Sequence, residues 1–214
     1  VGGKFLETEC GDWGCYYPTA VIRLNADGSL DNSFNPATAD IYSDHGEYRS
    51  LVVQSDGKVL IGGNFSTVNG TNRSGIARLN ADGSLDTSFS PGAGIQASVS
   101  SIALQTDGKV LIGGGVLVNG TNFNRIARLN DNGSLDGSFI PDTGIGGEAS
   151  SSIISVVVQS DGKVLVGGNF TNAYGNCIAR LTASGTLDST FNAGTGANGE
   201  VSSVAVQSDG KVLI

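Results

Sequence analysis

The chain has 214 residues, a formal net charge of −8, only 15% charged residues, 33 glycines and no methionine. This composition is typical of turn-rich all-β proteins and excludes a coiled coil. The shortage of Lys and Arg excludes the clustered basic surface that nucleic acid requires, and no run of about 18 apolar residues is present, so we expect neither nucleic-acid binding nor membrane insertion.

The chain begins and ends inside one recurring phrase. Val1–Phe5 reads V-G-G-K-F, the second half of the phrase K-V-L-I-G-G-N-F at Lys58–Phe65, and the final Lys211–Ile214 is its first half. We therefore expect a window cut from a longer array.

An insertion at Leu6–Pro18 carries the motif C-G-D-W-G-C. The spacing of Cys10 and Cys15 suits a small disulfide loop, and a disulfide indicates an oxidising, extracellular setting. The alternative is a pair of free thiols. A zinc site is less expected because no second cysteine pair or histidine cluster accompanies them. Cys177 has no evident partner.

The whole chain is built from one repeat of about 50 residues. Two anchors recur in order: a Q-x-D-G-K-V-L phrase at Gln54, Gln105, Gln159 and Gln207, and an Arg-Leu pair at Arg23, Arg78, Arg128 and Arg180. We treat residues 1–214 as a single β-propeller segment whose units are roughly 1–49 (partial), 50–98, 99–151, 152–200 and 201–214 (the start of the next).

Each unit contains two predicted β-hairpins. The first joins Ser50–Gln54 to Lys58–Phe65 through Ser-Asp-Gly, and the second joins Gly75–Asn80 to Ser84–Phe89 through Ala-Asp-Gly. Gly at the third loop position is the signature of a type I turn followed by a left-handed residue. The expected register pairs Val53 with Val59, Leu51 with Ile61 and Leu79 with Leu85, which predicts four-stranded antiparallel blades.

Arg and Asp recur eight residues apart in every unit, opposite each other across the second hairpin. Because an active site is rarely copied four times, we interpret them as structural ion pairs. The pairs are Arg23/Asp31, Arg78/Asp86, Arg128/Asp136 and Arg180/Asp188.

The strands are apolar on both faces, which predicts burial by a neighbouring sheet on each side. The Gly-Gly pairs, such as Gly62-Gly63, remove side chains where backbones approach closely or bulge. No helix or Lys-Ser/Thr follows them, so they are not a phosphate-binding loop. The sequence thus predicts an all-β protein, a β-propeller with four visible repeat units.

The repeated unit resembles a known family. It reads V-x-x-I/V-A/V-L/V-Q-x-D-G-K-V/I-L-I/V-G-G-x-F, followed by I-A-R-L-N-x-x-G-S-L-D-x-S-F. This pattern is similar to the delta-60 repeat, a β-propeller domain of unknown function in large bacterial surface and secreted proteins, and more distantly to kelch repeats. The resemblance covers nearly the whole chain. It implies a propeller fold and export, but no agreed activity and no catalytic set.

Nearly all variation falls in the second-to-third-strand and inter-unit connections, which an antiparallel blade places on one face. The only Trp and all five Tyr lie there, and amphipathic aromatics on one face suit glycan or protein binding. The alternative is local packing of long loops on themselves. The candidate ligand-binding residues are Trp13, Tyr16, Tyr17, Tyr42, His45 and Tyr48.

Two other kinds of chemistry are weaker candidates. Asn25–Asp31 alternates oxygen-bearing side chains as calcium loops do, but its Gly is misplaced for an EF-hand, so turn chemistry is the preferred explanation. The Asp40–Tyr48 loop holds the only histidine beside three carboxylates, which suits a metal site or a hydrolase. We expect no catalytic residues, no metal and no cofactor, with calcium the one alternative.

The preferred hypothesis is a non-enzymatic propeller scaffold at the extracellular or cell/particle surface. It would act in adhesion or in recognition of a glycan or protein through the loops. The alternatives are a purely structural component of a surface filament or viral tail, covered by sister subunits or further blades, and a hydrolase with a site near His45.

Overall fold

The computed structural model of the chain describes residues 2–4, 9–11, 14–16, 19–35, 38–39, 47–92, 95–118, 122–123, 125–141, 145, 152–170, 177–194 and 197–214. All regular structure in these ranges is β-strand. None of the described segments forms a helix long and apolar enough to cross a membrane.

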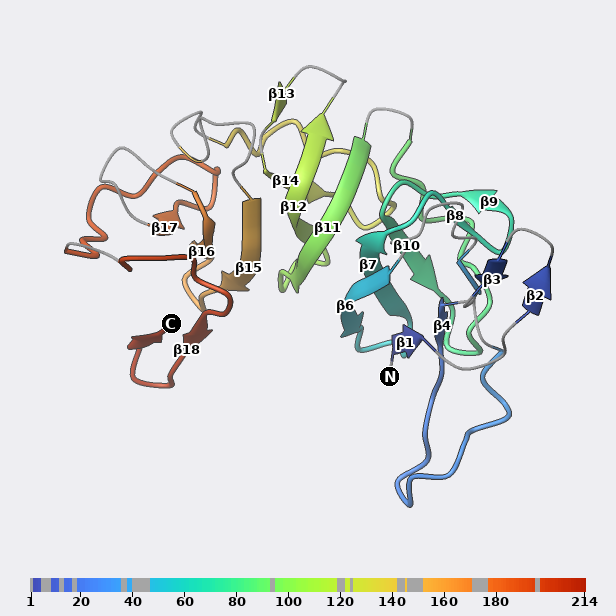
Figure 1. Cartoon of the computed structure of the whole chain (residues 1–214). Helices are drawn as coiled ribbons and strands as arrows, with labels where there is room; N and C mark the ends of the chain where they lie inside the picture. The colour runs from blue at the N-terminus through green and yellow to red at the C-terminus, as the bar shows by residue number, and fades with distance from the viewer. Residues whose placement is uncertain are drawn as a thin grey trace.

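Three sheets share one design, in which the second strand lies between the first and the third and every pairing is antiparallel (Figure 1). They belong to the second, third and fourth units, respectively. Their strands are β6 (Glu47–Val53), β7 (Val59–Asn64) and β10 (Ile76–Leu79); β11 (Ile95–Leu104), β12 (Val110–Val118) and β14 (Ile126–Leu129); β15 (Ser152–Val158), β16 (Val164–Asn169) and β17 (Ile178–Leu181).

The other strands are shorter. The first unit has a three-stranded sheet in the order β1-β4-β5, and two hairpins, β2-β3 and β8-β9, lie in connections. β13 extends the sheet of the third unit, and β18-β19 begins the fifth. Their bounds are β1 (Gly2–Lys4), β2 (Glu9–Gly11), β3 (Gly14–Tyr16), β4 (Thr19–Val21), β5 (Thr38–Ala39), β8 (Thr67–Val68), β9 (Thr71–Asn72), β13 (Asn122–Phe123), β18 (Ala205–Val206) and β19 (Val212–Leu213).

The first hairpin of a unit has the predicted turn and register. The N–H of Gln54 donates to the carbonyl of Lys58 at 2.8 Å, and the N–H of Gly57 donates to the carbonyl of Gln54 at 3.0 Å. The φ of Gly57 is 82°, in the left-handed region that a residue with a Cβ adopts only with strain. The register Val53↔Val59 and Leu51↔Ile61 is as predicted.

The fourth segment of each unit is shorter than the predicted strand. Its pairing is a single bridge, Leu79↔Leu85 in the second unit, with equivalents in the other three. The reason is a turn directly after the bridge: Asp86 Oδ1 accepts the N–H of Ser88 at 2.9 Å and its hydroxyl at 2.6 Å. This Asx turn bends the chain so that Phe89 returns over the sheet instead of continuing along it.

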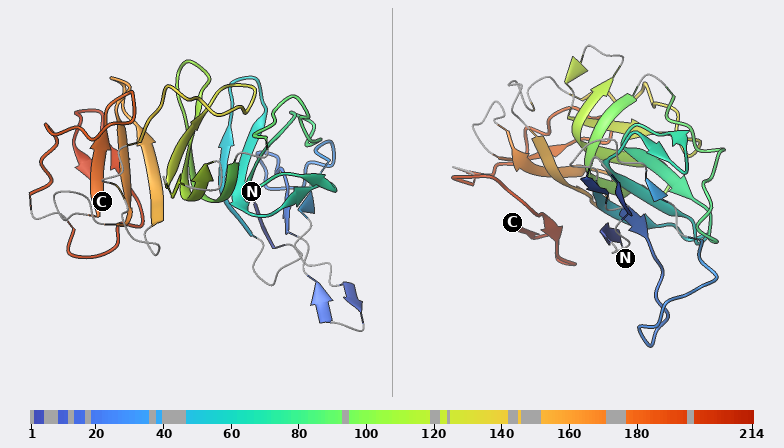
Figure 2. Two further views of the ribbon diagram at one scale, coloured as in Figure 1. Left: turned by 90° about the horizontal axis from the view of Figure 1, so that it is seen from above. Right: turned by 45° about the vertical axis from the view of Figure 1, so that its right-hand side comes forward.

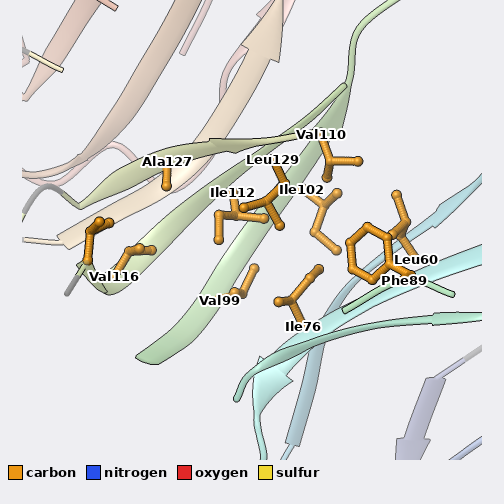
Figure 3. Close-up of a cluster of buried hydrophobic side chains, with 11 residues drawn as sticks. Leu60, Ile76, Phe89, Val99, Ile102, Val110, Ile112, Val116, Ala127 and Leu129 are labelled. Atoms are coloured by element: carbon orange, nitrogen blue, oxygen red, sulfur yellow. The ribbon is translucent and has the colours of Figure 1, made fainter. Parts of the chain in front are cut away.

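The sheets of the second and third units are buried on both faces by their neighbours, as the two-sided apolar pattern predicts. Figure 3 shows Leu60, Ile76 and Phe89 of the second unit meeting Val99 and Ile102 of the third in one cluster of buried side chains. The opposite face of the second unit carries Ile61, Ala77 and Leu79, which pack with Phe34 of the first unit. The core is therefore a series of layers between consecutive units.

The two glycines of each Gly-Gly pair have different functions. A Cβ on Gly62 would lie 2.7 Å from Val99 Cγ1, so the first glycine makes room for the next unit. A Cβ on Gly63 would overlap the backbone carbonyl of Glu47 within the same sheet. This second contact coincides with a β-bulge between Tyr48 and Ser50, where the strands are drawn together.

Hydrogen bonds also connect consecutive units. The hydroxyl of Ser50 accepts the N–H of Ile102 at 3.0 Å, and Ser101 and Ser155 make the same bond to Val156 and Val204. The sheets consequently stand side by side in chain order along an arc, which Figure 1 and the view from above in Figure 2 both show. Within the described residues, no strand of the first unit pairs with β18 or β19.

Gly113 is the first glycine of the pair in the third unit, equivalent to Gly62, and its close contact with the next unit predicts the effect of Gly113→Ala. A Cβ there would lie 2.6 Å from Val156 Cγ2 and 2.8 Å from Ile153 Cγ2, so the free energy of unfolding should fall by about 1–3 kcal/mol, as overpacking costs. Urea unfolding measures this loss. Gly137→Ala is the matched control because a Cβ at Gly137 meets nothing within 4 Å. Equal losses in both variants would contradict the close-contact explanation.

Candidate functional site

The antiparallel strands divide the connections between two faces. We call the face with the two tight turns of each unit, such as residues 54–58 and 80–84, the turn face. The two turns are neighbours there, since a Cβ on Gly57 would lie 3.4 Å from Ala81 Cβ. The opposite face, with the second-to-third-strand and inter-unit connections, is the loop face.

The turn face contains a buried carboxylate with four donors. Asp86 Oδ2 accepts Arg78 Nε at 2.8 Å and Lys58 Nζ at 3.0 Å, while Asp86 Oδ1 accepts both donors of Ser88. Only 5% of Asp86 and 4% of Arg78 is exposed. We call Lys58, Arg78, Asp86, Ser88 and their equivalents the aspartate network.

The aspartate network recurs along the chain. The predicted Arg/Asp ion pair is present in all four units: Arg23–Asp31 at 2.7 Å, and Arg78–Asp86, Arg128–Asp136 and Arg180–Asp188 at 2.8 Å. Sequence reasoning missed the lysine, which recurs as Lys58, Lys109 and Lys163 with Nζ to Asp Oδ2 distances of 2.7–3.0 Å. The sequence feature that could have indicated it is the Lys directly after the Gly of the first turn of each unit.

The donors hold these carboxyl groups ionised. The Lys109 ammonium and the Ser138 hydroxyl, with the Arg128 guanidinium, hold the pKa of Asp136 well below its usual range. At Asp86, burial raises the pKa, but the bonds from Ser88, Lys58 and Arg78 outweigh it and the net pKa is lowered. Hydrogen bonds from Ser33, together with Arg23, lower the pKa of Asp31 from 3.8 to about 2.

The arginine of each network also connects consecutive units. Arg78 Cζ lies 5.0 Å from the centroid of the Phe89 ring, so the guanidinium is held between this ring and Asp86. Arg78 Nη1 then donates to the carbonyl of Asp131 in the next unit at 2.8 Å. Arg23 and Arg128 reach Ala81 and Ala183 in the same way at 2.7 Å. The ionic groups are thus used within the protein.

The oxygen-bearing side chains considered for calcium serve the turns. Asp27 Oδ1 accepts the N–H and hydroxyl of Ser29 at 2.9 and 2.7 Å, and Asp31 Oδ1 accepts those of Ser33. In the part of the chain that the structure describes, no three or more His, Cys, Asp or Glu residues are grouped as metal ligands. Turn chemistry therefore accounts for the alternating oxygens.

Most predicted ligand-binding residues are not placed. Trp13, Tyr17, Tyr42 and His45 lie outside the described residues, and Tyr16 ends β3, of which only the backbone is described. Their role on the loop face stays a prediction.

Tyr48 is a correction. It was expected in an inter-unit loop, but it lies in β6, which begins one residue earlier than the tyrosine. Its ring is edge-on to Phe65, with centroids 5.4 Å apart, and it packs on the cluster that contains Val68 and Leu79. Burial raises the pKa of its hydroxyl. Tyr48 is therefore a partly buried strand residue that packs against this cluster.

Two buried arginines on the loop face were not anticipated. Arg73 follows the β8-β9 hairpin, is 8% exposed and donates from Nη1 to the carbonyl of Asn72 at 2.8 Å. Arg125 is 4% exposed and has a φ of 55°, where the second unit has Gly75 with a φ of 74°. Burial lowers the pKa of Arg125. The sequence feature that could have indicated these two residues is an extra Arg shortly before the I-A-R-L motif.

The cysteines fall in two environments. Cys10 and Cys15 are directly opposite each other in the register of the β2-β3 hairpin, although only the backbone is described there. Cys177 is a free thiol that packs, partly buried, beside Leu165 and Ile178. The disulfide stays a prediction.

With the geometry established, comparison with protein families identifies the repeat. The family model described as a beta-propeller domain of unknown function (DUF5122) matches residues 19–34, 54–89, 105–139 and 159–191, more than half of the chain. The chain belongs to this family. The matched segments contain the two turns and the aspartate network, so the DUF5122 signature is that of the turn face. Comparison with curated protein sequences yields no match.

Solved structures include similar folds. A protein of unknown function from Bacteroides caccae is 12% identical with a TM-score of 0.51, covering 84% of this chain and 63% of its own. Virginiamycin B lyase from Staphylococcus aureus is 20% identical with a TM-score of 0.48, covering 82% and 50%. PorZ, a surface component of the type-IX secretion system of Porphyromonas gingivalis, is 14% identical with a TM-score of 0.44, covering 93% and 30%.

The first likeness concerns the fold alone because its identity is low, and the other two have TM-scores below 0.5 and carry no argument. The DUF5122 chain spans less than two thirds of the length of each of these three proteins.

The aspartate network predicts a loss of stability in acid. Because the pKa of Asp136 is lowered on folding, its contribution is complete above about pH 4 and is lost as the pH falls towards the folded-state pKa. Asp136→Asn should lower the free energy of unfolding at pH 7 by about 3 kcal/mol, since it leaves a buried cation without its charge partner. The deficit should shrink by pH 2. Urea unfolding from pH 7 to pH 2 measures both.

Asp107→Asn is the control for this prediction. Asp107 is exposed on the same face and accepts the backbone N–H of Lys109 at 3.2 Å, a bond that Asn retains. Its unfolding curves should follow the wild type at every pH. A constant deficit of Asp136→Asn from pH 7 to pH 2 would contradict the ionic origin of the effect.

The cross-strand position of Cys10 and Cys15 predicts selective thiol labelling. After refolding in air, alkylation of the denatured chain without reductant should label Cys177 alone, and all three cysteines after reduction. Mass spectrometry of the tryptic peptides distinguishes these states. Labelling of Cys10 in the unreduced sample would rule out the disulfide.

Proposed function

We propose that the chain is a non-enzymatic propeller scaffold that recognises a glycan or a protein through its loop face, outside the cell or on a particle surface. The observation that carries the proposal is the division between the faces. The arginine and aspartate of the aspartate network pair with each other in every unit, whereas sequence variation is concentrated in the loops.

The turn face is a poor candidate for recognition or catalysis. The carboxylates of its aspartate network, such as Asp86 and Asp136, are buried and accept bonds from Lys, Arg and Ser of their own unit. A ligand would have to displace these donors and leave a buried charge unpaired, which costs several kcal/mol. The same arrangement in each unit also fits a structural role better than a single reaction site.

The loop face has the chemistry for binding. The only Trp and four of the five Tyr lie in its connections, and such side chains supply apolar area and a polar group together. The buried Arg73 and Arg125 show that these connections also hold cations close to the sheets. With a net charge of −8, the favoured partners are neutral glycans or proteins rather than polyanions.

The location outside the cell rests on the predicted Cys10–Cys15 disulfide, because such bonds persist in oxidising compartments. The family description names no activity, which is compatible with a scaffold.

A glycan array followed by a panel of extracellular-matrix proteins, both with the intact chain, tests the function. Trp13→Ala and Tyr42→Ala should each weaken binding about tenfold or more, since aromatic anchors dominate such surfaces. Tyr48→Phe is the control, because it removes a hydroxyl from a strand residue packed on Phe65, and binding should not change. Unchanged binding by both alanine variants, or no binding to either panel, would contradict loop-face recognition. Ester or glycoside turnover that disappears in His45→Ala would replace the proposal with a hydrolase.

A further inference from the structure

Arg73 is a buried cation that lies outside the aspartate network. Only 8% of it is exposed. The buried Arg78 and Arg128 of the network are each paired with an aspartate, whereas no carboxylate of the described residues pairs with Arg73. Its Nη1 donates to the carbonyl of Asn72 at 2.8 Å, and its Nε is buried with no acceptor in the part of the chain that the structure describes. A single peptide carbonyl therefore faces this charge where the network supplies a carboxylate.

The position of Arg73 in the fold explains its burial. Its N–H donates to the carbonyl of Ser66 at 2.7 Å, so the ladder of the β8-β9 hairpin continues one pair beyond Thr67↔Asn72. Because side chains alternate along a strand, Arg73 lies on the same side of the hairpin as Val68, a core residue that is 0% exposed. Asn72, the residue before it, is exposed. Arg73 is thus recessed at the base of an exposed hairpin of the loop face.

The fold of the repeat does not require an arginine at this position. Counted back five residues from the network arginine, the position is Arg73 in the second unit and Pro18, Phe123 and Gly175 in the other three. The sheets of the third and fourth units have the same strand order without a cation there. Because burial of a charge without a counter-charge is unfavourable, Arg73 lowers the stability of the chain until an anion reaches it.

We propose that Arg73 binds one carboxylate of a protein partner, the side chain of a glutamate. This inference rests on the proposed function and names the chemistry that the loop face would recognise. The planar guanidinium matches a carboxylate, and the buried Nε can donate to it. The net charge of −8 opposes a partner with many acidic groups, so the site takes a single carboxylate.

The depth of the site favours glutamate over an acidic sugar. A glutamate carboxylate is carried on a slender stem of two methylene groups, which can enter beside a recessed guanidinium. In a uronic acid the carboxylate is attached directly to the sugar ring, and the ring would meet the exposed hairpin first. Arginine paired with an acidic side chain in a desolvated pocket is also typical of the residues that dominate protein interfaces.

Urea unfolding of the 214-residue chain in sodium propionate tests the site, because propionate reproduces the end of a glutamate side chain. Sodium chloride at the same ionic strength is the reference. The unfolding midpoint of the wild type should rise with propionate concentration, since a ligand that binds only the folded state stabilises it. Sodium glucuronate should raise the midpoint less. An equal or larger rise in glucuronate would assign the site to acidic glycans and overturn the assignment to glutamate.

Arg73→Met retains the volume of the stem and removes the charge. Its midpoint in chloride should equal or exceed that of the wild type, because an apolar side chain replaces a buried unpaired cation. Its response to propionate should disappear. Arg49→Met is the matched control, since Arg49 lies in β6 of the same unit, is exposed and pairs with Glu47 at 2.6 Å. Its response to propionate should equal that of the wild type.

Three other outcomes would overturn the proposal. A lower chloride midpoint in Arg73→Met would show that the cation is already compensated and has a structural role. A propionate response that persists in Arg73→Met would place the anion elsewhere. No response in the wild type would mean that propionate does not enter, as when a carboxylate of the chain itself fills the site; Asp40 and Asp44 lie outside the described residues.

The result is independent of the aromatic residues in the proposed function. Neither propionate binding nor the Arg73→Met midpoint involves Trp13 or Tyr42, so a failure of the Trp13→Ala and Tyr42→Ala predictions would leave both readouts unchanged. A failure of the propionate experiment, in turn, would leave recognition through the aromatic residues of the loops untouched.

Discussion

The main constraint on each unit is that its network aspartate needs hydrogen-bond donors from several segments of the chain. The Asp86 carboxylate accepts hydrogen bonds from a lysine at the end of the first turn, an arginine on the third strand and a serine in its own Asx turn. Burying the carboxylate without these partners would cost several kcal/mol of folding free energy. The three segments are therefore held together in each unit whose aspartate is buried. The same arginine reaches the next unit's turn, which couples the order within a unit to the order between units.

Packing of apolar side chains between consecutive units also stabilises the fold. Gly62 and its equivalents let the valine and isoleucine side chains of the next sheet approach the strand backbone, and Ser50 and its equivalents bond the next first strand. Because each contact involves only adjacent units, the protein has the nearest-neighbour energetics of a repeat array.

The residues of the family signature have structural roles. The residues that define the DUF5122 family form turns, ion pairs and contacts between units. The family signature therefore describes how the array is built. The connections that the signature omits contain most of the variation between units. Arg73 and Arg125 show how far these connections diverge, since one unit places a buried arginine where its neighbour has a glycine.

The sequence by itself determined the local features. The Asp-Gly turns, the register Val53↔Val59, the Arg78–Asp86 pair and the all-β class follow from spacing and from backbone preferences that act over a few residues. The tertiary structure alone decided the rest, because it depends on which side chains meet across units. The bond of Lys58 to Asp86, the packing of Tyr48 on Phe65 and the bond of Arg78 to the next turn all require neighbours about 10 to 50 residues away, and no local pattern specifies those distances.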